Sequence, residues 1–166
     1  MFRTIDEFVF IWSREFEATQ KILKHITDKS LSQAVVPGGR SIGLLAWHIV
    51  TTIPEMMTRT GLSITMPGDE HTPPARAKEI FDAYNTVAEE LLNAVRSQWN
   101  DASLLLTDDM YGEQWKRGDS LSSLVFHQVH HRAQITVLMR QAGLRVPGIY
   151  GPSRDEWAAM GMKAPA

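Results

Sequence analysis

Three of the six histidines lie close together in the run FHQVHHRAQ. His127 and His131 are four positions apart, so on a helix their side chains project from one face, one turn apart. Two imidazoles in this arrangement can bind one metal ion at the bond length of roughly 2.0–2.1 Å that zinc–nitrogen ligation requires. His130 lies about 60° around the helix from His127 and cannot easily join the pair. The spacing therefore predicts His127 and His131, without His130, as metal ligands.

A third ligand is expected from another helix. His48, in LLAWHIV, is the best candidate because Leu45 and Ile49 place it at the edge of a buried helical stripe. Three neutral imidazoles leave a coordination position open, which is typical of catalytic rather than structural zinc sites. The alternative interpretation of a single inward histidine is a hydrogen-bonded core residue, and it is weaker for an i, i+4 pair.

Two further polar residues are candidates for supporting roles in catalysis. Glu55 follows His48 by seven positions, so an unbroken helix would carry it about two turns along the same face, where it could act as a base. Gln134 follows His131 by three positions and could hydrogen-bond a ligand or the substrate. The alternative for each is an ordinary polar side chain on a helix surface.

Apolar residues recur at helical spacing over four long segments, none of which alternates as a strand does. Pro54 predicts a kink or a break near Thr51 in the second segment. Ser41 is the expected N-cap of that segment, and Asp119 or Ser120 the expected cap of the fourth. The irregular stretch before the fourth segment could form a short turn or hairpin. The four segments are residues 4–27, 41–60, 75–98 and 119–143.

The loop of residues 61–74 is long for a connection between bundle helices, which favours a crossover over a simple meander. The predicted fold is therefore an all-α four-helix bundle. A chain of 166 residues fits one domain, residues 1–166, with a substantial core.

Composition excludes several classes of function. The net charge is −2 and no basic run is present, so a nucleic acid is not an expected partner. The chain has no cysteine, which excludes disulfides and thiolate ligands and requires any reacting thiol to come from outside the protein. The N-terminal stretch carries charges and resembles neither a signal peptide nor a membrane span. We expect a cytoplasmic protein.

The motifs LAWHI, HQVHHRAQ and LMRQAGLRVPGIYGPS resemble those of the DinB/YfiT-like superfamily of metal-binding four-helix bundles. The similarity extends from the first helix to Tyr150. It implies that His48, His127 and His131 hold the metal, whereas His130 inherits no role. It also implies an up-down-down-up topology, with the crossover between the second and third helices, and a homodimer.

The resemblance is less specific about chemistry. Characterised members include transferases and isomerases that use a low-molecular-weight thiol such as bacillithiol or mycothiol, and others are classed as metal-dependent hydrolases. We expect a metal-dependent enzyme that acts on a small molecule, by thiol transfer or by hydrolysis. Zinc or nickel is the expected ion, although imidazoles also suit copper and iron. The alternative is a non-catalytic metal-binding bundle that serves as a stress-linked binding or dimerisation module.

Overall fold

The computed structural model describes residues 2–164 and is dominated by four long helices. They are α1 (Ile5–Leu23), α2 (Ile42–Thr58), α3 (Ala77–Gln98) and α4 (Arg117–Gln141). A hairpin of two short strands, β1 (Thr107–Met110) and β2 (Glu113–Lys116), precedes α4. Three single turns of 3-10 helix complete the elements: η1 (Asp28–Ser30), η2 (Asp101–Leu105) and η3 (Ala158–Met160).

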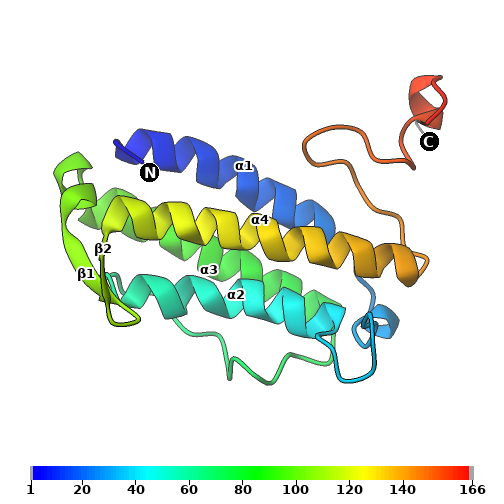
Figure 1. Cartoon of the computed structure of the whole chain (residues 1–166), viewed down its shortest axis with the longest axis horizontal. Helices are drawn as coiled ribbons and strands as arrows, with labels where there is room; N and C mark the ends of the chain where they lie inside the picture. The colour runs from blue at the N-terminus through cyan, green and yellow to red at the C-terminus, as the bar shows by residue number, and fades with distance from the viewer. Residues whose placement is uncertain (1, 165–166) are drawn as a thin grey trace.

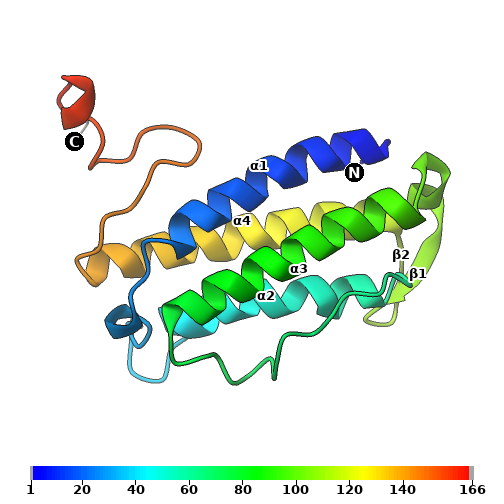
Figure 2. The ribbon, with the colours of Figure 1, turned by 180° about the vertical axis from the view of Figure 1, so that it is seen from behind.

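The helices run up, down, down and up, which confirms the predicted bundle (Figure 1). Residues 59–76 form the crossover and return along the length of the bundle, so that α3 starts near the start of α2 (Figure 2). α1 packs on α3 and α4, and α2 packs on the same two helices. α2 and α4 are therefore antiparallel neighbours, which brings the two histidine-bearing helices together.

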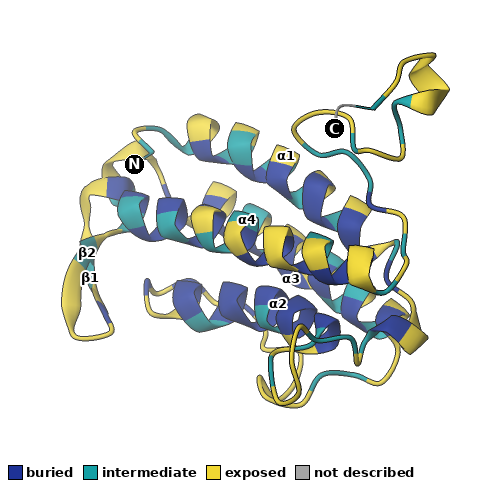
Figure 3. Ribbon diagram, turned by 45° about the vertical axis from the view of Figure 1, so that its right-hand side comes forward, coloured by how far each residue is buried: buried dark blue, intermediate teal, exposed yellow. Residues whose placement is uncertain are grey.

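The core consists of the inward faces of all four helices, as the burial pattern in Figure 3 shows. These faces arise from the 3.6-residue repeat of apolar side chains that the sequence displays. No helix among residues 2–164 is long and apolar enough to cross a membrane. The largest fully buried side chains include Phe8, Trp12, Ile22, Ile49, Ile53, Met57, Ile80, Tyr84, Leu91 and Leu121.

Capping residues set most of the helix ends. Thr4 forms a capping box with Glu7 at the start of α1, and the Ser41 hydroxyl accepts the Leu44 N–H at the start of α2, as predicted. α1 ends at Leu23 rather than Thr27, because Thr27 caps η1 instead.

The ends of α4 differ in how well the sequence predicted them. The helix begins at Arg117, ahead of the expected caps Asp119 and Ser120, and has no side-chain cap. Its C-terminal stop is as predicted: Gly143 has a φ of 70°, and the next N–H, of Leu144, donates to the Met139 carbonyl at 2.9 Å. These are the features of a Schellman motif.

Of the kink or break expected near Thr51, the break does not occur: α2 is continuous through Pro54. A proline inside a helix costs about 3 kcal/mol. Ile49, Ile53 and Met57 are fully buried, and each such side chain contributes roughly 1.5–3 kcal/mol on burial. Packing on α3 and α4 therefore outweighs the proline, and the helix stays intact.

The less regular segment before α4 forms the predicted hairpin, from β1 and β2. Its tip carries Tyr111 and Gly112 with φ values of 61° and 87°, as a type I′ turn requires. A tyrosine with positive φ is uncommon. It is held there because its hydroxyl donates to Glu55 on α2 at 2.6 Å and its ring lies 4.6 Å from the Arg59 guanidinium carbon.

Candidate metal centre

Three imidazoles meet between α2 and α4. The His127 Nε2 lies 3.1 Å from the Nε2 of His48 and 3.1 Å from the Nε2 of His131. The ligand nitrogens of all three residues lie within 4.8 Å of one another. The i, i+4 spacing aligns the two α4 histidines, and the antiparallel packing of α2 places His48 opposite them. The structure thus brings together the three histidines singled out in the sequence.

The opposite ring nitrogen of two of these histidines faces a helix neighbour. The Nδ1 of His131 lies 2.7 Å from the Gln134 Oε1, which accepts its proton. The Nδ1 of His48 lies 3.4 Å from the Thr52 hydroxyl, which itself donates to the His48 carbonyl at 2.6 Å. A proton on Nδ1 leaves the Nε2 lone pair free and directed at the other two rings. Gln134 was predicted as a partner; Thr52 was missed.

His127 is different, because its Nδ1 is buried without a hydrogen-bond partner among the described residues. Its Nε2 lies 3.1 Å from the Nε2 of His48 and of His131. A ring protonated on Nδ1 has only a lone pair at Nε2, so three such rings would have no proton between these nitrogens. A tetrahedral zinc ion with bonds of about 2.05 Å separates its nitrogen ligands by about 3.3 Å. Two of the three nitrogen pairs, at 3.1 Å, are close to this separation, so the three imidazoles could hold one divalent ion.

The electrostatics of the site keep the rings uncharged. Burial, together with neighbouring cationic groups, lowers the pKa of His48 and of His127 from 6.5 to about 4. Burial also lowers the pKa of His131, against the opposing effect of the hydrogen bond that its Nδ1–H donates to Gln134. Neutral imidazoles bind metals without competition from protons, so all three are available as ligands at neutral pH.

Two polar residues near the three histidines, His130 and Glu55, are not part of this group. His130 is exposed and its Nε2 lies 3.1 Å from the Gln134 amide nitrogen, outside the group of three. Glu55 accepts the Tyr111 hydroxyl with one carboxylate oxygen and pairs with Arg59 at 3.0 Å with the other. Glu55 therefore makes no hydrogen bond to the three imidazoles, although its charge acts weakly on His48.

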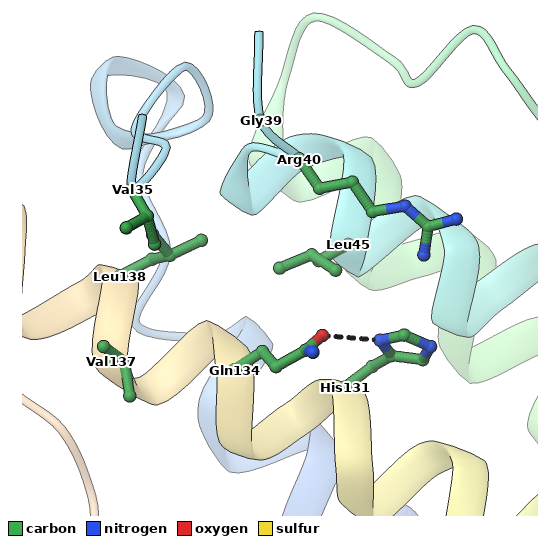
Figure 4. Close-up of a pocket in the computed structure, with 8 residues that line it drawn as sticks. All are labelled: Val35, Gly39, Arg40, Leu45, His131, Gln134, Val137 and Leu138. Atoms are coloured by element: carbon green, nitrogen blue, oxygen red, sulfur yellow. Dashed lines mark hydrogen bonds between the residues drawn. The ribbon is translucent and has the colours of Figure 1, made fainter. Parts of the chain in front are cut away.

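A cavity of about 350 Å³ opens beside His131, between the start of α2, the second half of α4 and the loop before α2 (Figure 4). This size lies at the low end of small-molecule sites. The cavity contains no acidic residue in its lining. Its lining residues are Val35, Gly39, Arg40, Leu45, His131, Gln134, Val137 and Leu138.

A buried ion pair on the other side of α4 fixes the orientation of the histidines. Arg132 donates to the Glu15 carboxylate on α1 at 2.5 Å and to the Thr19 hydroxyl at 3.0 Å. The Tyr150 hydroxyl joins this cluster by donating to Glu15 at 2.8 Å. Because Arg132 adjoins His131, its anchorage to α1 turns the histidine face of α4 toward α2. Sequence reasoning missed the pair, whose signal was a glutamate on the apolar stripe of α1.

Comparison with known proteins identifies the chain at the level of its family. A model of the DinB family matches residues 1–164. The chain belongs to the DinB family. The uncharacterized protein YrdA of Bacillus subtilis (strain 168) is 42% identical over 165 residues, which cover 99% of each chain.

Two solved structures are similar to this DinB-family chain. A DinB-like protein from Bacillus cereus ATCC 10987 has a TM-score of 0.88 at 44% identity, covering 90% of this chain and 100% of its own. The DinB-like protein YjoA of Bacillus subtilis has a TM-score of 0.70 at 16% identity, covering 89% and 99%. The second shares the fold alone. These relatives support the family and the bundle, and none of their names states a reaction.

Proposed function

We propose that His48, His127 and His131 bind one divalent metal ion, zinc or nickel, in a DinB-family enzyme that acts on a small molecule. The observation that carries the proposal is the convergence of three neutral imidazoles beside a cavity. A divalent ion with three imidazole ligands keeps a position open, at which it can lower the pKa of water or of a thiol. The protein's own contribution is to hold the rings, fix their tautomers and shape the cavity.

Of the two reaction classes, the site favours thiol transfer. Hydrolysis moves two protons from the attacking water, and a general base such as a carboxylate can accept one of them. The cavity lining contains no carboxylate, and Glu55 is already engaged by Tyr111 and Arg59. A thiol has only one proton, which it would lose to solvent on binding the ion as a thiolate, so its attack on an electrophile requires no second proton transfer. Since the chain lacks cysteine, a low-molecular-weight thiol would be the co-substrate.

The metal site is tested by the metal content of the untagged protein, measured by mass spectrometry after purification and after exposure to zinc or nickel. We expect close to one equivalent in the wild type and a large loss in His48→Ala, His127→Ala and His131→Ala. His130→Ala is the matched control, because this exposed neighbour lies outside the group of three and should leave the metal bound. A wild-type content below about a tenth of an equivalent after loading would refute the site.

The reaction is tested by screening the metal-loaded protein with several thiols and electrophiles, beside a panel of esters and amides. Metal-dependent consumption of a thiol is the expected result, and ester or amide cleavage without a thiol would favour hydrolysis instead. If the triple histidine variant only melts at a lower temperature and the wild type turns over nothing, the protein is a non-catalytic metal-binding bundle.

A further inference from the structure

The cavity beside His131 has two chemically different ends (Figure 4). The Arg40 guanidinium and the His131 ring lie at one end, whereas Val35, Val137 and Leu138 lie at the other. Val35 and Val137 are exposed, at 64% and 55%, so the apolar end continues onto the surface. A cavity with a cationic end and an apolar end fits a ligand of matching polarity.

Arg40 is the only charged side chain of the cavity lining apart from the titratable His131, and no acidic group in that lining neutralises it. Arg40 is exposed, and among residues 2–164 its guanidinium has no ion-pair or hydrogen-bond partner. Its charge is a minor cause, after burial, of the lowered pKa of His48, His127 and His131. An unpaired guanidinium at this position offers a planar set of donors to a carboxylate.

We propose that the cavity binds a small organic acid, whose carboxylate pairs with Arg40 beside the three histidines and whose apolar chain lies against Val35, Val137 and Leu138. The inference rests on the proposed function in one respect: the metal centre would be where such a ligand reacts. The volume of about 350 Å³ limits the ligand to a compact chain. The contact with Arg40, in contrast, is a property of the cavity that can be measured without any turnover.

The test is an NMR titration of the ¹⁵N-labelled, zinc-loaded protein with hexanoate, hexanesulfonate, hexanamide and butanoate, followed at the Gly39 and Leu138 amides. We expect hexanoate to bind about three- to fivefold more tightly than hexanamide, as a charge pair with an exposed guanidinium supplies. Each methylene between butanoate and hexanoate should add about fourfold in affinity. Hexanesulfonate pairs with guanidinium but is a poor metal ligand, and we expect that it also binds.

The variants separate Arg40 from the metal as the anion site. Arg40→Gln should lose about three- to fivefold in hexanoate affinity and nothing for hexanamide, and Arg40→Lys should recover part of the loss. Arg14→Gln is the matched control, because Arg14 is exposed on α1 and lies over Phe10, outside the cavity. Equal affinity for hexanoate and hexanamide would overturn the proposal. Hexanoate binding that Arg40→Gln leaves unchanged, with no hexanesulfonate binding, would also overturn it, because the carboxylate would then sit on the metal.

The same titration distinguishes this inference from the proposed function. Repeated on His127→Ala, which should lack metal, it should still show the Arg40-dependent preference for hexanoate over hexanamide. If the wild type binds no metal but keeps this preference, the proposed enzyme fails and the acid-binding cavity stands. If the metal is bound and the preference is absent, the inference about Arg40 fails alone.

Discussion

Arg132→Met should destabilise the bundle far more than any exposed charge change. The Arg132 and Glu15 side chains are only 3% and 12% exposed, so the substitution leaves a carboxylate buried with the Tyr150 hydroxyl as its remaining side-chain partner. Removing one member of a buried ion pair costs about 3–5 kcal/mol. For a chain of this size each kcal/mol lowers the Tm by about 2–4 °C, so we expect a fall of roughly 6–20 °C.

The measurement is urea and thermal unfolding of the chelated protein, followed by circular dichroism, so that metal binding does not contribute. The matched control is Arg76→Met. Arg76 pairs with Glu79 at 2.6 Å, but these side chains are 71% and 43% exposed, and such a pair contributes less than about 1 kcal/mol.

The double variant Glu15→Leu, Arg132→Met tests the physical cause. Replacing both charges by apolar groups removes the unpaired carboxylate, so its stability should return to within about 1–2 kcal/mol of the wild type. A loss below about 1 kcal/mol in Arg132→Met would refute the reasoning. So would a double variant as unstable as the sum of the two single ones, since the pair would then contribute through packing rather than charge.

Three further predictions concern the site and the surface. Gln134→Leu removes the acceptor for the His131 Nδ1 proton and should weaken zinc affinity about 10–100-fold with little change in Tm, as competition with a chromophoric chelator would show; an unchanged affinity would contradict the role of Gln134. The pKa values of His48 and His127 are lowered from 6.5 to about 4, so the unfolded chain binds more protons in this range and the chelated protein should lose stability as pH falls from about 6.5 to 4. The double variant His48→Asn, His127→Asn should lose less over the same range in parallel unfolding titrations, and equal losses would count against the shifts. Phe126 is 70% exposed on α4, and we predict that it lies in a homodimer interface: light scattering should give a dimer for the wild type and a monomer for Phe126→Glu, and a monomeric wild type would exclude it.

The bundle was predictable because each helix repeats apolar residues with a period that only a helix can bury on one side. The boundaries were less so. Thr27 has the apolar neighbours of a continuing helix, but its hydroxyl caps η1. Whether a threonine continues one helix or caps the next depends on the tertiary fold. Pro54 predicted a kink or a break, and no break occurs, because local propensity ignores the packing energy that α2 gains on two sides.

The sequence indicated some residues of the candidate site and not others. Spacing alone indicated His127 and His131, whereas His48 was added chiefly through the resemblance, because nothing local shows which residue of α2 faces α4. Thr52 reads in the sequence as a polar interruption of an apolar helix, and its position beside a ring nitrogen appears only in three dimensions. Arg40 gave no signal at all, since its relation to the site depends on the path of the loop before α2.

The crossover between α2 and α3 has a consequence for the order in which the protein matures. His48 and His127 are 79 positions apart, and the whole of α3 lies between them in the sequence. Closing a loop of this length costs conformational entropy before core contacts offset it, so we expect the bundle to assemble before the three histidines meet. If the three histidines bind an ion as proposed, the free zinc or nickel concentration would set the occupied fraction of the site and would add to the stability of a bundle that is already formed.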